Sequence, residues 1–244
     1  MNKQNKVVII TGGARGIGKA LAETFAHSGW AVIVNYRASS DEAEKLCQKI
    51  NSTGAMALPF QADVTDINAV NKMIKLVLSK FGRIDALINN AGICVNSSLA
   101  RMSDDAWDSV IATNLRGPWN MMRACAPAMA SQKSGNIINI GSIGALRGMA
   151  GCANYSAAKG ALLELTKEAA REFGQDGICV NAVLPGFHKT GMGAHASPDY
   201  VKAAINESVL KTTTDINELL KFVVMLASTK TVSGQIFNWD SRIL

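Results

Sequence analysis

Two side chains that can exchange a proton, Tyr155 and Lys159, stand four residues apart in a stretch with a helical apolar pattern. This spacing places both side chains on one face of a helix. A free phenol has a pKa of about 10, and a neighbouring ammonium group lowers that pKa because it stabilises the phenolate. A phenol tuned in this way can protonate the oxygen of a carbonyl group as that group is reduced. The pair therefore predicts acid–base chemistry, although an ordinary exposed helix face can carry the same spacing.

Ser142 lies thirteen residues before Tyr155 and follows a predicted strand. Its hydroxyl group can hold and orient the same carbonyl oxygen. The sequence Gly-Ser-Ile-Gly around it does not predict the nucleophile elbow of a serine hydrolase, and no His and Asp occur in a suitable order. We therefore expect Ser142 to assist Tyr155 rather than to act as a nucleophile.

A glycine-rich segment, Thr11-Gly12-Gly13-Ala14-Arg15-Gly16-Ile17-Gly18, joins the first predicted strand to a helix. Gly12 permits a tight turn, Gly16 lets the backbone approach a pyrophosphate, and Gly18 lets the helix pack closely on the sheet. The helix N-terminus offers free N–H groups and a positive dipole to the phosphates. A plain tight turn is the alternative, but the strand–loop–helix context favours a dinucleotide site.

The end of the second predicted strand indicates which dinucleotide binds. An NAD site places Asp or Glu there to hold the ribose 2′-hydroxyl, whereas this chain has Asn35-Tyr36-Arg37. Arg37, together with Arg15 in the glycine-rich loop, can bind a 2′-phosphate. The pattern favours NADP(H), with a solvated Arg37 as the alternative.

Two further strand ends carry candidate binding residues. Asp63 can accept a hydrogen bond from an adenine amino group, or it can cap the helix that begins near Thr65; the residues leave both open. The sequence Asn89-Asn90-Ala91-Gly92 follows the fourth strand, and its small residues leave room for a cofactor ribose, although a plain turn is equally simple.

Short β-branched runs alternate with longer helical patterns along the whole chain. This alternation predicts an α/β fold, a doubly wound parallel seven-stranded sheet of the Rossmann type, as a single domain over residues 1–244. The segment 104–129 is expected to be one helical region, kinked near Pro118. The predicted strands are 7–11, 31–36, 55–61, 84–89, 136–140, 178–184 and 234–238, and the other predicted helices are 17–28, 41–51, 67–81, 153–173 and 215–227.

Composition excludes several classes of protein. The chain of 244 residues is 48% hydrophobic and 18% charged, which argues against disorder. It has no apolar run of about 20 residues and no signal-peptide pattern, so we expect no membrane span and a cytoplasmic location. Five scattered cysteines are expected to be free thiols, and three separated histidines predict no metal site. The net charge of +6 is dispersed, which argues against nucleic acid and suits a phosphate-rich cofactor or an acidic carrier.

Several motifs occur together in one order between residue 7 and about residue 190. They are Thr11-Gly12-x-x-x-Gly16-x-Gly18, Asp63, Asn89-Asn90-Ala91-Gly92, Asn114, Ser142, Tyr155-x-x-x-Lys159 and Pro185-Gly186. In these residues the chain resembles the classical short-chain dehydrogenase/reductase family. Within that family it is most similar to 3-oxoacyl-[acyl-carrier-protein] reductases, a likeness carried by residues 82–92 and 178–181.

The resemblance implies a role for each matching residue. Asn114 would position a water molecule that links Lys159 to solvent, and Asn114, Ser142, Tyr155 and Lys159 would form the catalytic set. Pro185, Gly186, Thr190 and the backbone at His188 would hold the nicotinamide carboxamide. The full expected NADP(H) surface is Gly12, Arg15, Gly16, Ile17, Gly18, Arg37, Asp63, Val64, Asn90, Ala91, Gly92, Ile140, Tyr155, Lys159, Pro185, Gly186, His188 and Thr190.

The function implied is NADPH-dependent reduction of 3-oxoacyl thioesters to 3-hydroxyacyl products, under a substrate lid around residues 187–213. The alternatives are reduction of another ketone, such as a polyketide, quinone or secondary-metabolite intermediate, and a non-catalytic NADP-binding sensor. The family implies a homotetramer and an acidic acyl carrier protein as partner. One feature argues against a carrier protein: where relatives often have a basic residue, this chain has Gln175-Asp176-Gly177. Lys133 is then the remaining candidate for a cation that docks the carrier.

Overall fold

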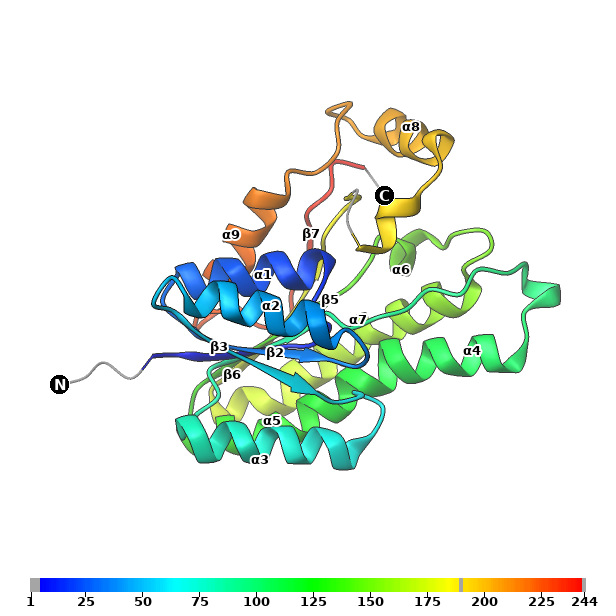
Figure 1. The fold of residues 1–244 in the computed structure, drawn as a ribbon. Helices are drawn as coiled ribbons and strands as arrows, with labels where there is room; N and C mark the ends of the chain where they lie inside the picture. The colour runs from blue at the N-terminus through cyan, green and yellow to red at the C-terminus, as the bar shows by residue number, and fades with distance from the viewer. Residues whose placement is uncertain (1–4, 189–190, 243–244) are drawn as a thin grey trace.

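The apolar runs of the sequence form one parallel sheet, in the strand order β3-β2-β1-β4-β5-β6-β7 (Figure 1). The computed structural model describes residues 5–188 and 191–242. All six neighbouring pairs run parallel, which confirms the predicted fold class. The strands are β1 (Val7–Ile10), β2 (Ala31–Tyr36), β3 (Met56–Gln61), β4 (Ala86–Asn89), β5 (Gly135–Ile140), β6 (Ile178–Leu184) and β7 (Ile236–Asn238).

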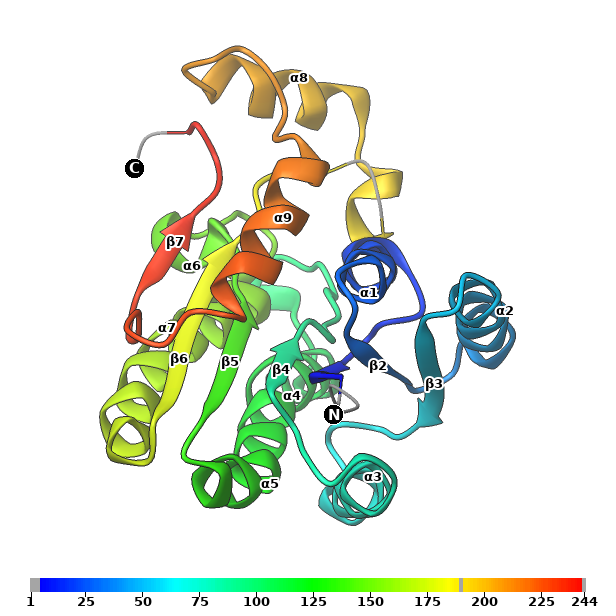
Figure 2. The ribbon, with the colours of Figure 1, turned by 90° about the vertical axis from the view of Figure 1, so that its left-hand side faces the viewer.

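Helices cover both faces of this sheet (Figure 2). Val8 and Ile10 pack with α1, α2 and α9, whereas Val7 and Ile9 pack with α3, α5 and α7, because successive strand side chains point to opposite faces. The helices are α1 (Gly16–His27), α2 (Ser40–Asn51), α3 (Ile67–Phe81), α4 (Asp104–Ile111), α5 (Gly117–Gln132), α6 (Gly144–Arg147), α7 (Ala153–Phe173), α8 (Pro198–Glu207) and α9 (Ile216–Leu226). Shorter turns are η1 (Leu99–Arg101), η2 (Ala112–Arg116), η3 (Gly174–Asp176) and η4 (Gly191–His195).

The strand order reverses between β1 and β4, which are neighbours in the sheet although β2 and β3 lie between them in the sequence. Ile10 pairs with Ile88 at the carboxyl ends of these two strands. In an open α/β sheet, this reversal creates the crevice in which ligands bind. The loops after β1, β4 and β5, which carry the predicted site residues, therefore meet at one edge.

The segment 104–129 differs from its prediction. Instead of one helix with a kink near Pro118, α4 and α5 are separated by a π-helical turn, η2. Pro118 lies in the first turn of α5, where the missing N–H costs nothing. The helical region is thus interrupted by the wider π-helical turn η2, which lies just before Pro118 in the sequence. Turns of this kind occur often at functional sites.

The region after β6 contains more regular structure than the sequence predicted. Ser197 accepts a hydrogen bond from the Tyr200 N–H and so caps α8, with Pro198 at the first helical position. This Ser-Pro-Asp start is typical of a helix N-terminus. The start of α3 is capped by Asp66, while Asp63 accepts from Thr65 in a local turn.

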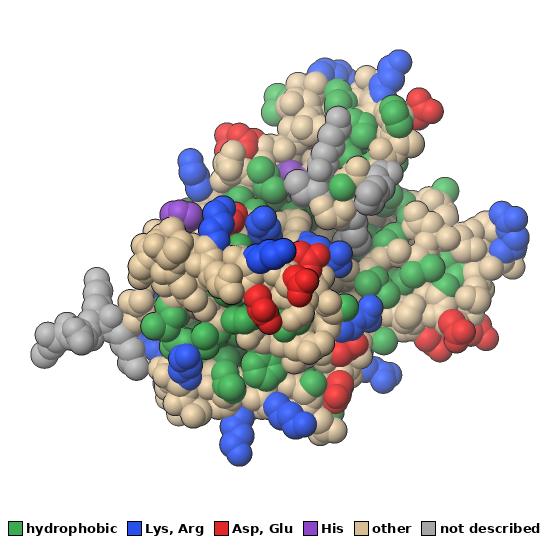
Figure 3. Space-filling model, in the orientation of Figure 1, with side chains coloured by type: hydrophobic (Ala, Val, Ile, Leu, Met, Phe, Trp, Pro, Cys, Tyr) green, Lys and Arg blue, Asp and Glu red, His purple; other side chains and the backbone are tan. Residues whose placement is uncertain are grey.

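Lys and Arg side chains are interspersed with Asp and Glu on the face shown in Figure 3, and form no continuous stripe there. In the described part of the chain, no helix combines the length and the apolar character needed to cross a membrane.

Candidate active site

Tyr155 and Lys159 lie one turn apart on α7, and both face the carboxyl end of the sheet. The Lys159 Nζ atom is 5.9 Å from the centre of the Tyr155 ring. It donates a hydrogen bond of 2.6 Å to the carbonyl oxygen of Ile140, the last residue of β5. Lys159 is buried, at 3% exposure. The strand end therefore fixes the position of the ammonium group beside the phenol.

Ser142 reaches Tyr155 from the loop after β5. Its Oγ accepts a hydrogen bond of 3.2 Å from the Gly144 N–H. The Ser142 hydroxyl is also hydrogen-bonded to the Tyr155 phenol. This hydrogen bond lowers the pKa of Tyr155, as expected when the serine donates toward the phenol oxygen. Two polar hydrogens thus converge where a substrate oxygen could sit.

Burial controls the charge of both titratable groups. The pKa of Tyr155 is raised to about 12, first because the phenol is shielded from water, while the Ser142 hydrogen bond acts in the opposite direction. The pKa of Lys159 is lowered to about 8 because its ammonium group is buried. The pKa of Tyr155 therefore lies above its ordinary value in the chain by itself, whereas the prediction was a lowered pKa, and loss of hydration is the largest cause.

Asn114 occupies the π-helical turn η2 and is fully buried. Its Oδ1 accepts from the Ile93 N–H at 2.8 Å, and its Nδ2 donates to the Ile93 carbonyl at 2.8 Å. A side chain on Gly92 would come within 3.2 Å of Asn114 Oδ1, which explains a glycine at that position. The structure therefore brings Asn114 to the loop after β4, and Lys159 Nζ would lie 3.9 Å from the same Cβ position on Gly92.

The glycine-rich loop forms a shallow backbone cradle at the N-terminus of α1. Gly12 has a φ of +61°, and a Cβ there would lie 2.9 Å from the Cα of Ala91. Asn90 ties the two loops together, because its Nδ2 donates to the carbonyls of Thr11 and Gly12 at 2.9 and 3.1 Å. A Cβ on Gly18 would lie 2.3 Å from the Gly12 carbonyl oxygen, so this glycine allows the helix to approach. This cradle suits a pyrophosphate, which needs a bare backbone and free N–H groups.

The two arginines predicted to select the cofactor lie at the rim of this cradle. Arg15 is the exposed N-cap residue of α1. Arg37 follows β2, with its Nη1 3.7 Å from Asp63 Oδ2 and its side chain 62% exposed. Val64 is buried against Gly117, and Ile17 is half-buried at the start of α1. These positions are compatible with the expected nucleotide surface.

The loop after β6 completes the site. Gly186 has a φ of +78°, and a Cβ there would lie 2.1 Å from Thr214 Oγ1, so only glycine fits. The His188 Nε2–H donates to the Pro185 carbonyl oxygen at 2.7 Å, and burial lowers the pKa of this imidazole. A neutral His188 thus braces the Pro185-Gly186 turn. Thr190, also expected to contact the cofactor, lies outside the described residues.

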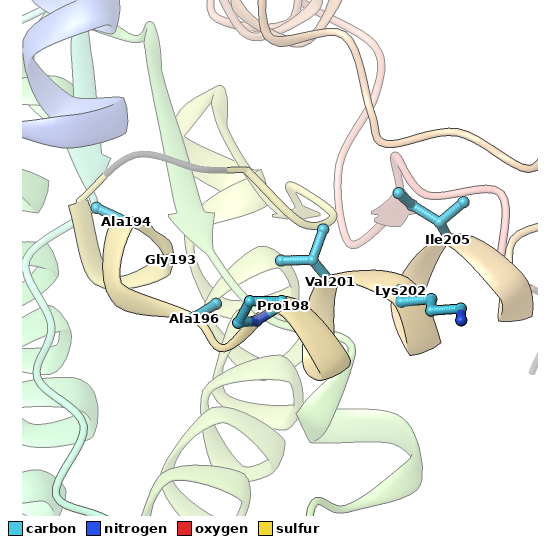
Figure 4. Close-up of a pocket in the computed structure, with 7 residues that line it drawn as sticks. All are labelled: Gly193, Ala194, Ala196, Pro198, Val201, Lys202 and Ile205. Atoms are coloured by element: carbon cyan, nitrogen blue, oxygen red, sulfur yellow. The ribbon is translucent and has the colours of Figure 1, made fainter.

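The segment after His188 lies over the cradle. Gly191 in η4 approaches Gly16, where a Cβ would come within 3.1 Å of the Gly191 Cα. Arg147 on α6 holds α8 through a 2.6 Å ion pair with Glu207. A groove of about 440 Å³ runs along η4 and α8. Figure 4 shows the side chains that line it, with Val201 and Ile205 on α8. The lining of this groove comes from η4, α8 and the residues between them.

Asn154 is a positioning residue that the sequence analysis did not single out. Its Nδ2 donates to the carbonyls of Val95 and Ala106 at 3.1 and 2.9 Å, and its Oδ1 accepts from the Tyr155 N–H at 2.8 Å. One buried amide thus joins the loop after β4, helix α4 and the start of α7. In the sequence, the feature that could have indicated this role is a polar residue directly before Tyr155.

Residues 6–201 match the model of the short chain dehydrogenase family, so the chain belongs to that family. It is therefore an oxidoreductase that acts on alcohol and carbonyl groups with a nicotinamide cofactor.

The chain is similar over nearly its whole length to proteins named 3-oxoacyl-[acyl-carrier-protein] reductase. It is 41% identical to that protein of Staphylococcus epidermidis over 233 residues, which cover 95% of this chain and 96% of the relative. It is 40% identical to that of Staphylococcus aureus over 235 residues, covering 96% of each chain. The Synechocystis sp. relative is 38% identical over 239 residues, covering 98% of this chain and 97% of the relative.

Proposed function

We propose that this protein uses NADPH to reduce the keto group of 3-oxoacyl thioesters to a 3-hydroxyacyl product. The observation that carries the proposal is the convergence of Ser142, Tyr155, Lys159 and Asn114 beside the nucleotide cradle. The names of the relatives supply the substrate class.

In this mechanism the residues of the chain orient the carbonyl and supply a proton. NADPH, when bound, supplies a hydride to the carbonyl carbon. Ser142 and Tyr155 donate hydrogen bonds to the carbonyl oxygen, which polarises it. Tyr155 then transfers its proton to that oxygen as negative charge develops there. A phenol with a pKa of about 12 stays protonated until that moment, so it is ready to act as the acid.

Lys159 and Asn114 support the proton transfer. The buried ammonium of Lys159 stabilises the phenolate left on Tyr155. Its low pKa of about 8 means that it can also release a proton near neutral pH. Asn114 lies beside Gly92 and Lys159, where it would hold the water that carries protons from solvent.

Arg15 and Arg37 support the choice of NADPH. The residues at the end of β2, Asn35-Tyr36-Arg37, include no Asp or Glu of the kind that holds a ribose 2′-hydroxyl in an NAD site. Arg37 contacts Asp63 at 3.7 Å, too long for a strong ion pair, and the guanidinium stays available. We expect the remaining predicted contacts, from Ile140 to His188, to bind the same cofactor.

Whether the acyl group is carried by a protein or by a small thiol is a separate question. One ion pair on the surface argues against a carrier protein. Lys133, the candidate docking cation, pairs with Asp176 at 2.8 Å. This pairing lowers the positive charge available to an acidic carrier protein, and it favours a small thioester or another ketone as a second candidate substrate.

Loss of NADPH absorbance on adding acetoacetyl-CoA tests the proposed activity, with an acetoacetyl carrier protein and a panel of ketones as parallel arms. Turnover of both thioesters supports the proposal, and a higher kcat/KM for the carrier-bound form identifies it as the physiological class. Turnover of ketones alone would favour the second candidate. Tight NADPH binding without any turnover would point instead to a sensor.

We further propose that residues 1–244 act as a single domain, that residues 187–213 form a lid, and that the chain is a homotetramer. A groove of about 480 Å³ along α5 and α7 supports the assembly. Trp119 is 43% exposed at this groove and stacks with the Arg123 guanidinium, which is 4.1 Å from the ring centre. Aromatic residues and Arg are enriched in the buried cores of protein interfaces, which is why this groove supports the proposed assembly. Light scattering on the purified protein measures the mass directly.

A further inference from the structure

Two cysteines, Cys94 and Cys152, meet at the edge of the proposed active site. Cys94 lies in the loop after β4, and Cys152 is the residue directly before α7. Their Sγ atoms lie 2.9 and 3.3 Å from one shared acceptor, Asn96 Oδ1. The two thiols are also within hydrogen-bonding reach of each other. The backbone holds the contact in place, because Ser97 forms a parallel bridge with Cys152.

The other three cysteines lie elsewhere. Cys47 is buried among α1, α2 and the sheet, whereas Cys125 is buried on the opposite face with α3 and α5. Cys179 is on β6. The contact between Cys94 and Cys152 is thus a property of this one corner of the molecule.

This corner is next to the acid–base group. The carbonyl of Cys152 accepts from the Ser156 N–H at 2.8 Å, in the helical turn that contains Tyr155. Negative charge on either thiol would raise the pKa of Tyr155. Cys94 is exposed to solvent and Cys152 is buried, at 6% exposure. A small reagent therefore meets Cys94 first.

We propose that Cys94 and Cys152 form a modification site at which a hydroperoxide makes a reversible disulfide that switches the enzyme off. The Cys94 sulfur attacks the peroxide, the O–O bond breaks, and a sulfenic acid and one water form. The Cys152 sulfur then attacks the sulfenic sulfur, the S–O bond breaks, and a second water leaves. Two thiols lose two electrons and two protons, and one hydrogen peroxide becomes two waters.

The disulfide would act through the loop of residues 93–97. Forming the S–S bond removes both S–H groups from Asn96 Oδ1 and draws this loop toward the start of α7. Ile93 in the loop carries both hydrogen bonds of Asn114, and the Val95 carbonyl accepts from Asn154. Moving the loop therefore disturbs two residues that position the catalytic groups, and we expect kcat to fall more than KM rises.

The reaction is slow at neutral pH. Although the Cys94 residue is exposed, its thiol is partly shielded from water, and this shielding together with Cys152 raises the pKa of the thiol to about 11, so only a small fraction is the reactive thiolate. We therefore expect sustained exposure to peroxide, rather than a brief pulse, to produce the disulfide.

Peptide mapping after peroxide treatment tests the site without relying on any activity. The five cysteines fall in five different tryptic peptides, and Cys94 and Cys152 lie in peptides 84–101 and 148–159. We expect these two peptides to become linked, and the free-thiol count of the denatured protein to fall from five to three. Reduction with dithiothreitol should restore both. Linkage of another cysteine pair, or a thiol count that stays at five, would overturn the site.

The activity arm tests the switch. We expect turnover to fall at least about tenfold in the linked protein and to return with dithiothreitol, whereas Cys152→Ser and Cys94→Ser show no loss that dithiothreitol reverses. Cys179→Ser is the matched control and should respond like the wild type. Full turnover in fully linked protein would contradict the switch while leaving the modification site intact. If no substrate is reduced at all, the peptide map still decides whether the site exists.

Discussion

Tyr155 and Lys159 are two groups whose neutral forms are favoured by the same burial. One pKa rises to about 12 and the other falls to about 8. A site that disfavours charge in this way strengthens every electrostatic contact made inside it. In the proposed mechanism, the phenol therefore keeps its proton until the carbonyl oxygen takes it.

Tyr155→Phe tests the proposed acid at the residue scale. The substitution removes the transferable proton and leaves the ring packing unchanged. We expect kcat to fall at least about a hundredfold, with the Kd for NADPH nearly unchanged. Steady-state kinetics and fluorescence titration measure the two quantities, and substantial remaining turnover would remove Tyr155 from the acid role.

The pKa of Lys159 predicts a dependence of stability on pH. Between about pH 8 and pH 10 the unfolded chain keeps a proton on this lysine that the folded chain has lost, so the free energy of unfolding rises with pH. The rise is about 2 kcal/mol over this range. Above about pH 10 the raised pKa of Tyr155 acts in the opposite direction, since the unfolded phenol ionises first.

Urea titrations of the wild type and of Lys159→Met at both ends of this range isolate the effect, because all other groups titrate alike in the two proteins. The difference between their unfolding free energies should change with pH by the stated amount. A constant difference would mean that the folded lysine keeps an ordinary pKa.

Arg37→Asp tests the cofactor choice. The substitution removes a charge-assisted hydrogen bond to the 2′-phosphate and adds a repelling carboxylate next to Asp63. We expect the ratio of kcat/KM for NADPH to that for NADH to fall about ten- to a hundredfold. Arg171→Met, on the distant face of α7, is the control and should leave the ratio unaltered. A ratio unchanged in Arg37→Asp would place the phosphate elsewhere.

At the scale of elements, the ends of strands and the starts of helices make the site. The β1–α1 loop is held against the β4 loop by Asn90 and by Thr11, whose Oγ1 accepts from the N–H groups of Asn90 and Ala91 at 3.0 Å each. The cradle is rigid because side chains of one loop satisfy the backbone of the other.

Gly12→Ala tests this cradle, with Gly29→Ala as a matched control. Both glycines have positive φ, at +61° and +80°, so both substitutions carry a backbone cost of roughly 1–2 kcal/mol. Only at Gly12 does the new methyl group meet the Ala91 backbone, while Gly29 has open space. We expect both variants to lose stability and Gly12→Ala alone to bind NADPH at least about tenfold more weakly. Equal affinities in calorimetric titration would contradict the cradle.

At the scale of the whole molecule, the C-terminal segment ties α8, which is part of the proposed lid, to the sheet. β7 pairs with β6, and Ser208 at the end of α8 forms an antiparallel bridge with Arg242. Arg242 is buried in an ion pair with Asp240 and also contacts Tyr200 on α8. The position of the lid thus depends on residues more than thirty positions further along the chain.

Arg242→Met tests this connection. It leaves the Asp240 carboxylate buried without its partner, which we expect to cost roughly 3–5 kcal/mol of unfolding free energy. Arg171→Met breaks the exposed pair with Glu168 and should change stability by about 0.5 kcal/mol or less. Chemical denaturation compares the two, and similar small losses would show that the buried pair does not stabilise the fold.

Local patterns in the sequence determined the sheet, its helices and the family. The bounds of α3, α7 and β6 match their predictions, because apolar periodicity depends on residues that are neighbours in the chain. The glycine-rich loop and the Tyr-x-x-x-Lys spacing are also local, which is why they indicated the chemistry. The π-helical turn η2 was not predicted, because a π-helix contains one more residue per turn than an α-helix but has no characteristic amino-acid composition.

Only the tertiary structure decided the electrostatics and the long-range contacts. The direction of each pKa shift depends on how completely water is excluded, and that is set by every element around α7. The meeting of Cys94 with Cys152, the bracing by Asn154 and the pairing of Lys133 with Asp176 join residues distant in the sequence. Such contacts follow from strand order and register, which bring chain segments together regardless of their separation.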